Sequence, residues 1–169
     1  MTMTAEAIIE ALEMKPHPEG GYYCETYRAA DTITADALPK RFPDDRALGT
    51  AIYFLLPGGD VSCFHRLRCD ELWHFYCGNP LVIHLLDPAG AYREIHLGPD
   101  IAAGERPQAV VPHAHWVGAT VTEPEGFALV GCTTTPGFEF ADFEMGGRNA
   151  LLAAYPRHAQ VITRLSYEL

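Results

Sequence analysis

The chain has 169 residues and a net charge of −10, from twelve Lys and Arg against twenty-two Asp and Glu. This charge opposes attraction to nucleic-acid phosphates and to anionic membrane surfaces, so we expect neither as a partner. The length fits one domain with a sizeable core, which we place over residues 1–169. The five cysteines are odd in number and include no C-x-x-C pair, a pattern that predicts free, reduced thiols.

The N-terminal residues predict a short helix over about residues 4–14. Ile8, Ile9 and Leu12 recur at helical spacing, and Thr4 is a suitable N-cap residue. The segment MTMTAEAIIEALEM has no basic n-region and no long apolar run, so it is neither a secretion signal nor a membrane span. We therefore expect a soluble protein in the cytoplasm.

The next segment, HPEGGYYCETYR, begins with helix-breaking residues and continues as a predicted strand. In one interpretation this strand lines or covers a pocket, with Tyr22 in its wall and Arg28 binding a carboxylate or phosphate through two hydrogen bonds. In the other it is an edge strand that limits aggregation or pairs with a partner subunit. The polar residues DALPKRFPDDRALG that follow predict a loop.

From Thr50 onward, short apolar runs alternate with turn residues at nearly regular spacing. Such a pattern without helical segments predicts an antiparallel sandwich or barrel, here over about residues 20–145. Helical spacing returns over about residues 148–165, where Asn149 is a candidate cap and Pro156 separates two short helices. The predicted fold class is all-β with short flanking helices.

The stretch GGDVSCFHRLRCDELWHFYCG carries the strongest candidate site. Because side chains alternate along strands, His65 shares a face with Cys63 and Leu67, and Glu71 shares a face with Trp73 and Phe75. We expect His65 and Glu71 to pair inside the barrel as catalytic groups, with Trp73 and Phe75 as an apolar wall for a ligand. The alternative is a buried His–Glu hydrogen bond without chemistry. His74 is expected to point away.

A second histidine pair occurs in QAVVPHAHWVGATV. We interpret His113 as a solvated turn residue, whereas His115 shares strand parity with Val117 and is a candidate ligand-binding residue. His115 could also complete a metal site with His65 and Glu71. Trp116 is expected to face the other way. The other histidines are interpreted as structural or exposed: His17, His84, His96 and His158.

Gly59, His65, Glu71 and Gly78 match the spacing of the first cupin motif, with Leu67 in the place of its second histidine. More closely, the ordered segments HPEGGYYCETYR, SCFHRLRCDELWHFYCG, VVPHAHWVGA and GCTTTPGFEFADFEMGG resemble the cupin-5 (DUF985) family of the RmlC-like cupin superfamily, from about residue 16 to 165.

This resemblance implies a double-stranded β-helix, or jelly-roll barrel, that is commonly a homodimer. It is related in shape to the sugar-nucleotide epimerases that convert dTDP-4-keto sugars. Leu67 and Val117 replace two of the four usual metal ligands, so no cofactor is expected.

Three functional hypotheses follow, because cupins host isomerases, dioxygenases and pure binding proteins. The leading one is a metal-independent cupin that binds a sugar-like or nucleotide-like small molecule in the barrel. It would act as an epimerase or isomerase with His65 as base and Tyr22 or Tyr76 as the second proton-transfer group. The second is a metal-dependent oxygenase or isomerase that uses His65, Glu71 and His115. The third is a non-catalytic binding protein or structural dimer.

Overall fold

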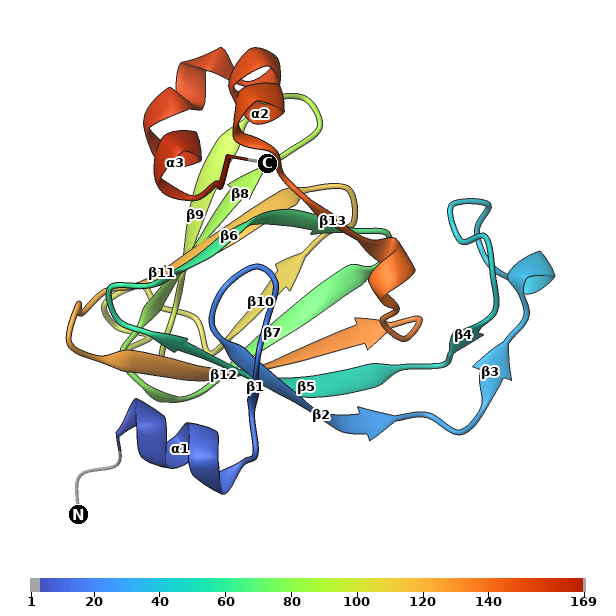
Figure 1. The fold of residues 1–169 in the computed structure, drawn as a ribbon, viewed down its shortest axis with the longest axis horizontal. Helices are drawn as coiled ribbons and strands as arrows, with labels where there is room; N and C mark the ends of the chain where they lie inside the picture. Colours follow the sequence, from blue (N-terminus) through green and yellow to red (C-terminus); the bar gives the residue numbers. More distant parts are fainter. Residues whose placement is uncertain (1–3, 169) are drawn as a thin grey trace.

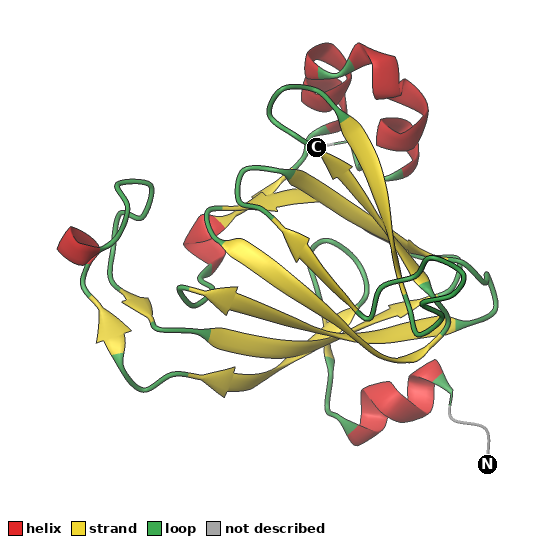
Figure 2. Ribbon diagram, turned by 180° about the vertical axis from the view of Figure 1, so that it is seen from behind, coloured by secondary structure: helices red, strands yellow, loops and turns green. Residues whose placement is uncertain are grey.

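The computed structural model describes residues 4–168 and consists mainly of two antiparallel sheets that face each other (Figure 2). The six-stranded sheet has the order β1-β2-β5-β12-β7-β10. Its strands are β1 (Lys15–Pro16), β2 (Tyr22–Arg28), β5 (Thr50–Pro57), β12 (Phe127–Thr135), β7 (Asp70–Gly78) and β10 (Gln108–Val111). The order places β12, late in the chain, between β5 and β7.

The five-stranded sheet has the order β13-β6-β11-β8-β9. Its strands are β13 (Phe143–Met145), β6 (Val61–Leu67), β11 (Trp116–Val121), β8 (Leu81–Leu86) and β9 (Tyr92–Leu97). A separate two-stranded sheet, β3 (Thr32–Ile33) with β4 (Arg46–Ala47), forms an arm that extends away from the two main sheets (Figure 1). The predicted all-β fold class with short flanking helices is confirmed.

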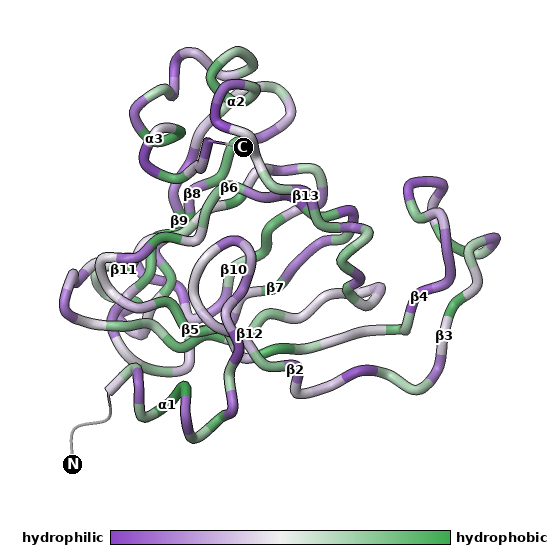
Figure 3. Tube along the Cα trace, in the orientation of Figure 1, coloured by the Kyte–Doolittle hydropathy of each residue, from purple (hydrophilic) through white to green (hydrophobic). Residues whose placement is uncertain are grey.

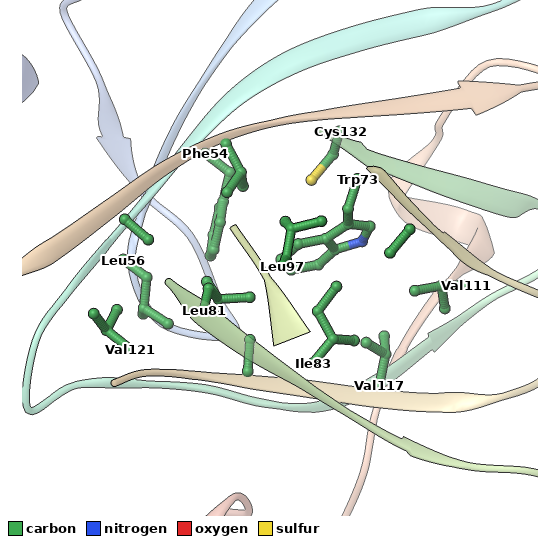
Figure 4. Close-up of a cluster of buried hydrophobic side chains, with 14 of the residues drawn as sticks. Phe54, Leu56, Trp73, Leu81, Ile83, Leu97, Val111, Val117, Val121 and Cys132 are labelled. Atoms are coloured by element: carbon green, nitrogen blue, oxygen red, sulfur yellow. The ribbon is translucent and has the colours of Figure 1, made fainter. Parts of the chain in front are cut away.

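The space between the two sheets is filled over part of its length by apolar side chains from both (Figure 4). Trp73 lies at the centre of this core and is 1% exposed, between Phe54 of the same sheet and Ile83 and Val117 of the other. Burial of such side chains stabilises the fold by about 1.5–3 kcal/mol each. The alternation of hydrophobic and hydrophilic residues that produces this core can be followed along the strands in Figure 3.

Short helices cover the outer faces of the sheets. Helix α1 (Ala5–Ala11) is capped by Thr4, whose side chain accepts a hydrogen bond from the Ala7 N–H, as predicted. Its Ile8 packs on Leu55 of β5. No helix within residues 4–168 is long and apolar enough to cross a membrane.

The C-terminal segment folds as α2 (Arg148–Ala154), the 3₁₀ turn η3 (Pro156–His158) and α3 (Ala159–Arg164). A further pair of 3₁₀ turns, η1 (Ala35–Ala37) and η2 (Phe140–Asp142), lies in the connections. Pro156 separates the helices as predicted, but Gly147 rather than Asn149 holds the cap position of α2. Trp116 packs in the cluster beneath these helices, so it faces away from the barrel interior as expected.

Candidate functional site

A cavity of about 800 Å³, here called the barrel cavity, opens between the two sheets beside the apolar core. Its volume is in the range of small-molecule sites, which are typically about 300–1,000 Å³. The polar and aromatic side chains that define its chemistry are His17, Glu19, His65, Glu71, Trp73 and Phe143. His65 and Glu71, predicted from the cupin-like stretch, therefore line the same cavity.

A β-bulge in β6 decides which side chains face this cavity. Val117 pairs with His65 and Ala119 with Ser62, so β6 has one residue more than β11 between these pairs. An extra residue reverses the alternation of faces, which brings Ser62 to the same side as His65. Cys63 was expected to share the face of His65, but its thiol lies against Tyr167 instead. The regular two-residue period was therefore wrong at this point.

The turn between β1 and β2 supplies the carboxylate that pairs with His65. The Cys63 N–H donates to the backbone oxygen of Glu19 at 2.8 Å, which fixes the turn onto β6. At Gly20 φ is +109°, and a Cβ there would come within 2.2 Å of the Val61 oxygen. Only glycine permits both this conformation and this close approach. The turn is visible in Figure 1 as the dark blue loop between β1 and β2.

Glu19 is buried, and its carboxylate lies between two imidazoles and a hydroxyl. Its Oε2 lies 3.2 Å from Nε2 of His65 and 3.2 Å from Nδ1 of His17, and its Oε1 accepts from the Ser62 hydroxyl at 2.8 Å. Burial alone would raise the pKa of this carboxyl, but the two imidazoles and the hydroxyl outweigh it and the pKa is lowered. The surroundings of Glu19 therefore favour its ionised form.

Both ring nitrogens of His65 have partners within the protein. Its Nδ1 lies 2.8 Å from the Cys63 carbonyl oxygen, which can only accept, so Nδ1 carries a proton and donates. Its Nε2 lies at ion-pair distance from the Glu19 carboxylate, 3.2 Å from Oε2. Phe143 stacks on the imidazole, with the two ring centroids 5.3 Å apart.

Glu71 lies in the same cavity, but its surroundings shift its pKa in the direction opposite to that of Glu19. Its Oε2 accepts from Nε1 of Trp73 at 2.7 Å, and the buried thiol of Cys132 lies beside it. Burial raises the pKa of Glu71; the charge of His65 acts against this shift and that of Glu19 adds to it. Glu71 does not form the predicted hydrogen-bonded pair with His65, because Glu19 occupies that position.

Several other predicted site residues lie away from the barrel cavity. Phe75 shares the inward face of β7 but packs against the apolar core. Tyr22 packs with the cluster beneath α1, and Tyr76 is 51% exposed against Tyr53 on the outer face. Neither tyrosine can serve as the second proton-transfer group proposed from the sequence. The tyrosine that lines the cavity is Tyr23, one residue later in β2.

His115 also lies outside the barrel cavity. Its Nδ1 is 3.2 Å from the His113 carbonyl oxygen. His115 precedes β11 (Trp116–Val121), so the predicted sharing of a strand face with Val117 does not apply to it. Across residues 4–168 no three or more His, Cys, Asp or Glu side chains are placed to hold a metal ion. The described residues therefore do not assemble the His65, Glu71 and His115 ligand set. His113 is exposed at the turn, as expected.

Arg28 stands at the mouth of the barrel cavity. It makes two hydrogen bonds to Glu25, at 3.0 and 2.8 Å, and another to Glu139 at 2.8 Å. The predicted bidentate recognition by Arg28 is thus directed at a carboxylate of the protein itself. This engagement leaves the guanidinium poorly disposed to bind an anionic ligand.

Sequence reasoning missed the roles of Glu19 and His17. Glu19 lies in the segment HPEGGYYCETYR, where no role is predicted for it, and His17 is interpreted from the sequence as structural or exposed. One signal was present: a Gly-Gly pair directly after Glu19 indicates a turn whose backbone approaches another strand closely. The free state of all five cysteines, in contrast, agrees with the prediction.

The facing antiparallel sheets with a polar cavity between them define a cupin jelly roll. The same fold occurs in oxalate decarboxylase from Bacillus subtilis, at a TM-score of 0.54 and 15% identity over 91% of this chain and 37% of that one. Identity this low shows similarity of fold alone.

The chain belongs to the Cupin_5 family, described as "Cupin superfamily (DUF985)", which it matches over residues 6–146. It is similar to protein SO0799 from Shewanella oneidensis, with 42% identity, a TM-score of 0.90, and coverage of 99% of this chain and 100% of that one. A hypothetical protein from Leishmania major gives 35% identity, a TM-score of 0.88, and coverage of 98% and 100%. "Uncharacterized protein YML079W" of Saccharomyces cerevisiae is 27% identical over 81% of this chain and 72% of its own length. The family resemblance seen in the sequence is confirmed.

Proposed function

We propose that the barrel cavity binds a small, polar, uncharged molecule such as a sugar and catalyses proton transfer on it, as an isomerase or epimerase does. The supporting observation is the pair of buried carboxyl groups, Glu19 and Glu71, in one cavity. Their surroundings push the pKa of Glu19 down and that of Glu71 up. Two titratable groups separated in this way can act as a base and an acid in the same reaction.

In this proposal Glu19 and His65 form the basic unit. The Glu19 carboxylate lies 3.2 Å from Nε2 of His65, and His65 is held in place by its hydrogen bond to the Cys63 oxygen. Glu71 is the acid, since burial raises its pKa and so favours the carboxyl form that can donate a proton. His65 is therefore a positioning residue for Glu19, rather than the free base expected from the sequence.

The walls of the cavity favour an uncharged ligand. Tyr23, Phe54 and Phe143 provide apolar surface against which a ring can pack, and the carboxyl groups accept hydrogen bonds from hydroxyls. Of the two basic residues that line the cavity, Arg28 is engaged by two carboxylates and Lys15 is exposed. Of the sugar-like and nucleotide-like ligands considered from the sequence, the sugar-like class fits this cavity better.

Deuterium exchange tests the proposal even while the natural substrate is unidentified. The protein is incubated in D₂O with aldoses and ketoses, and incorporation of deuterium next to the carbonyl is measured by NMR. We expect incorporation with the wild type and a loss of at least about 100-fold with Glu71→Gln or Glu19→Gln, the usual size of an acid–base contribution. His115→Asn, outside the cavity, is the matched control and should retain wild-type exchange.

A second candidate function is ligand binding without turnover. Within residues 4–168, every buried side-chain nitrogen and oxygen has a hydrogen-bond partner. A fully satisfied network is also what a rigid binding site needs. A metabolite retained by the purified protein, identified by mass spectrometry and not exchanged in D₂O, would favour this function. The homodimer and the cytoplasmic location remain predictions.

A further inference from the structure

A second cavity of about 450 Å³, here called the arginine cavity, adjoins the barrel cavity. Leu67 and Phe143 line both. Three arginines and a histidine stand around the second cavity: Arg41, Arg66, Arg68 and His113. The chain has only twelve Lys and Arg and a net charge of −10. A concentration of guanidinium groups in one small cavity therefore creates a local positive potential within an acidic protein.

Two of these arginines hold each other in position through backbone oxygens. Nε of Arg41 donates to the Arg68 oxygen at 2.7 Å, and Nη1 of Arg68 donates to the Arg41 oxygen at 3.2 Å. A carbonyl oxygen fixes a guanidinium group without neutralising its charge. A guanidinium has five N–H donors, so each of these arginines keeps further donors for another acceptor.

The carboxylates near the cavity already have cations of their own. Both oxygens of Asp142 accept from the buried Arg46 at 2.7 Å, while Nε of Arg68 lies at 3.9 Å. Glu144 makes two hydrogen bonds to Arg66, at 2.8 and 3.0 Å. Arg68 shares the Asp142 carboxylate with Arg46, and Arg41 forms no ion pair within residues 4–168, so guanidinium groups outnumber carboxylates in the wall of this cavity.

The backbone of the cavity wall is strained at one position. Ala114 has φ +63°, in the left-handed region that favours glycine, and its N–H donates to the Leu67 oxygen at 3.1 Å. Such a conformation costs about 1–2 kcal/mol for a residue with a Cβ and tends to occur where a binding site requires it.

We propose that the arginine cavity binds an oxyanion, the phosphate or carboxylate group of a small molecule, with Arg41 and Arg68 as its main donors. Planar guanidinium groups match the geometry of both anions. The inference rests on these residues alone and does not depend on catalysis in the barrel cavity.

The test is a titration of the ¹⁵N-labelled full chain, followed through the Nε–H signals of its arginines. Sodium phosphate and sodium acetate are added in separate arms, with sodium chloride keeping the ionic strength constant. We expect saturable shifts of the Arg41 and Arg68 signals with a Kd in about the millimolar range. The arm with the lower Kd identifies the preferred anion. Shifts that grow without saturation in both arms, or equal those in chloride alone, would overturn the proposal.

Variants assign the binding to these residues. Arg41→Gln and Arg68→Gln should each weaken binding by at least about tenfold, the effect of losing one charge-assisted hydrogen bond. Arg93→Gln, an exposed arginine of β9, is the matched control and should leave the Kd unchanged. Arg68→Lys keeps the charge without the planar fork, so it should give an intermediate Kd. It is the second variant to use where Arg68→Gln does not fold. An equal loss with Arg93→Gln would contradict a specific site.

Discussion

Glu19 Oε2 lies 3.2 Å from Nε2 of His65, and this contact joins the turn between β1 and β2 to the middle of β6. The turn is fixed by backbone contacts as well, through the Cys63 N–H and the close approach of Gly20 to Val61. The catalytic proposal therefore depends on a turn outside the cupin-like stretch. Its consequences can be tested through stability, pH dependence and side-chain coupling.

Glu71→Gln should stabilise the protein at neutral pH. Because the pKa of Glu71 is raised in the folded state, its contribution is fully present below its ordinary pKa of 4.5 and is lost as pH rises through the raised value. Glutamine resembles the neutral carboxyl and can still accept from Trp73. Urea unfolding from pH 4 to pH 8 should show a smaller loss of free energy of unfolding for Glu71→Gln. An unchanged or steeper loss would contradict the raised pKa.

Glu19→Gln should have the opposite pH dependence. The lowered pKa of Glu19 means that its stabilising contribution is present above 4.5 and is lost as pH falls through the lower, folded-state value. We expect a cost of about 1.5–3 kcal/mol at pH 7, typical of hydrogen bonds to a charged group. The difference between wild type and variant should shrink below pH 4.5. A difference independent of pH would show that Glu19 is not the ionised partner.

Gly20→Ala should displace the turn that carries Glu19. Its added Cβ would stand 2.2 Å from the Val61 oxygen, and its φ of +109° is unfavourable for alanine. We expect a loss of at least about 2 kcal/mol in the free energy of unfolding, measured with urea. Gly104→Ala is the matched control, because φ there is +94° but no atom lies within 4 Å. Equal losses in the two variants would refute the close approach as the cause.

The ion pairs of the two arginines Arg46 and Arg28 should differ strongly in their effect on stability. Arg46→Met leaves the buried Asp142 carboxylate without its partner, at a cost of about 3–5 kcal/mol. Arg28→Met breaks exposed pairs and should cost less than about 1 kcal/mol.

The double variant Arg46→Met/Asp142→Leu is the control for the buried pair. It should recover much of the stability lost in Arg46→Met, since no buried charge remains. The free energy of unfolding of the wild type, Arg46→Met and the double variant is measured by thermal and urea unfolding. A double variant less stable than Arg46→Met would show that the loss comes from packing and not from the unpaired charge.

Much of the fold could be predicted because its causes are local. Alternating apolar residues, turn residues and the Thr4 cap are visible in any short window of the sequence. The family resemblance then gave the jelly roll, and the convergence of His65 and Glu71 on one cavity followed from strand parity. These predictions did not depend on which distant segments approach one another.

The rest of the site depends on long-range geometry. The bulge in β6 exists only in its pairing with β11, so the inward position of Ser62 could not be read from alternation. The approach of Glu19 to His65 requires the turn between β1 and β2 to cross from one sheet to the other. Tyr23 rather than Tyr22 faces the cavity because register places Tyr22 beneath α1.

A double-mutant cycle tests the central claim most directly: that Glu19, and not Glu71, is the carboxylate partner of His65. Free energies of unfolding at pH 7 are measured for His65→Asn, Glu19→Gln, Glu71→Gln and the two double variants that contain His65→Asn. We predict a coupling energy of about 1–3 kcal/mol between positions 65 and 19, and a clearly smaller one between positions 65 and 71. A larger coupling between 65 and 71 would contradict the site described here.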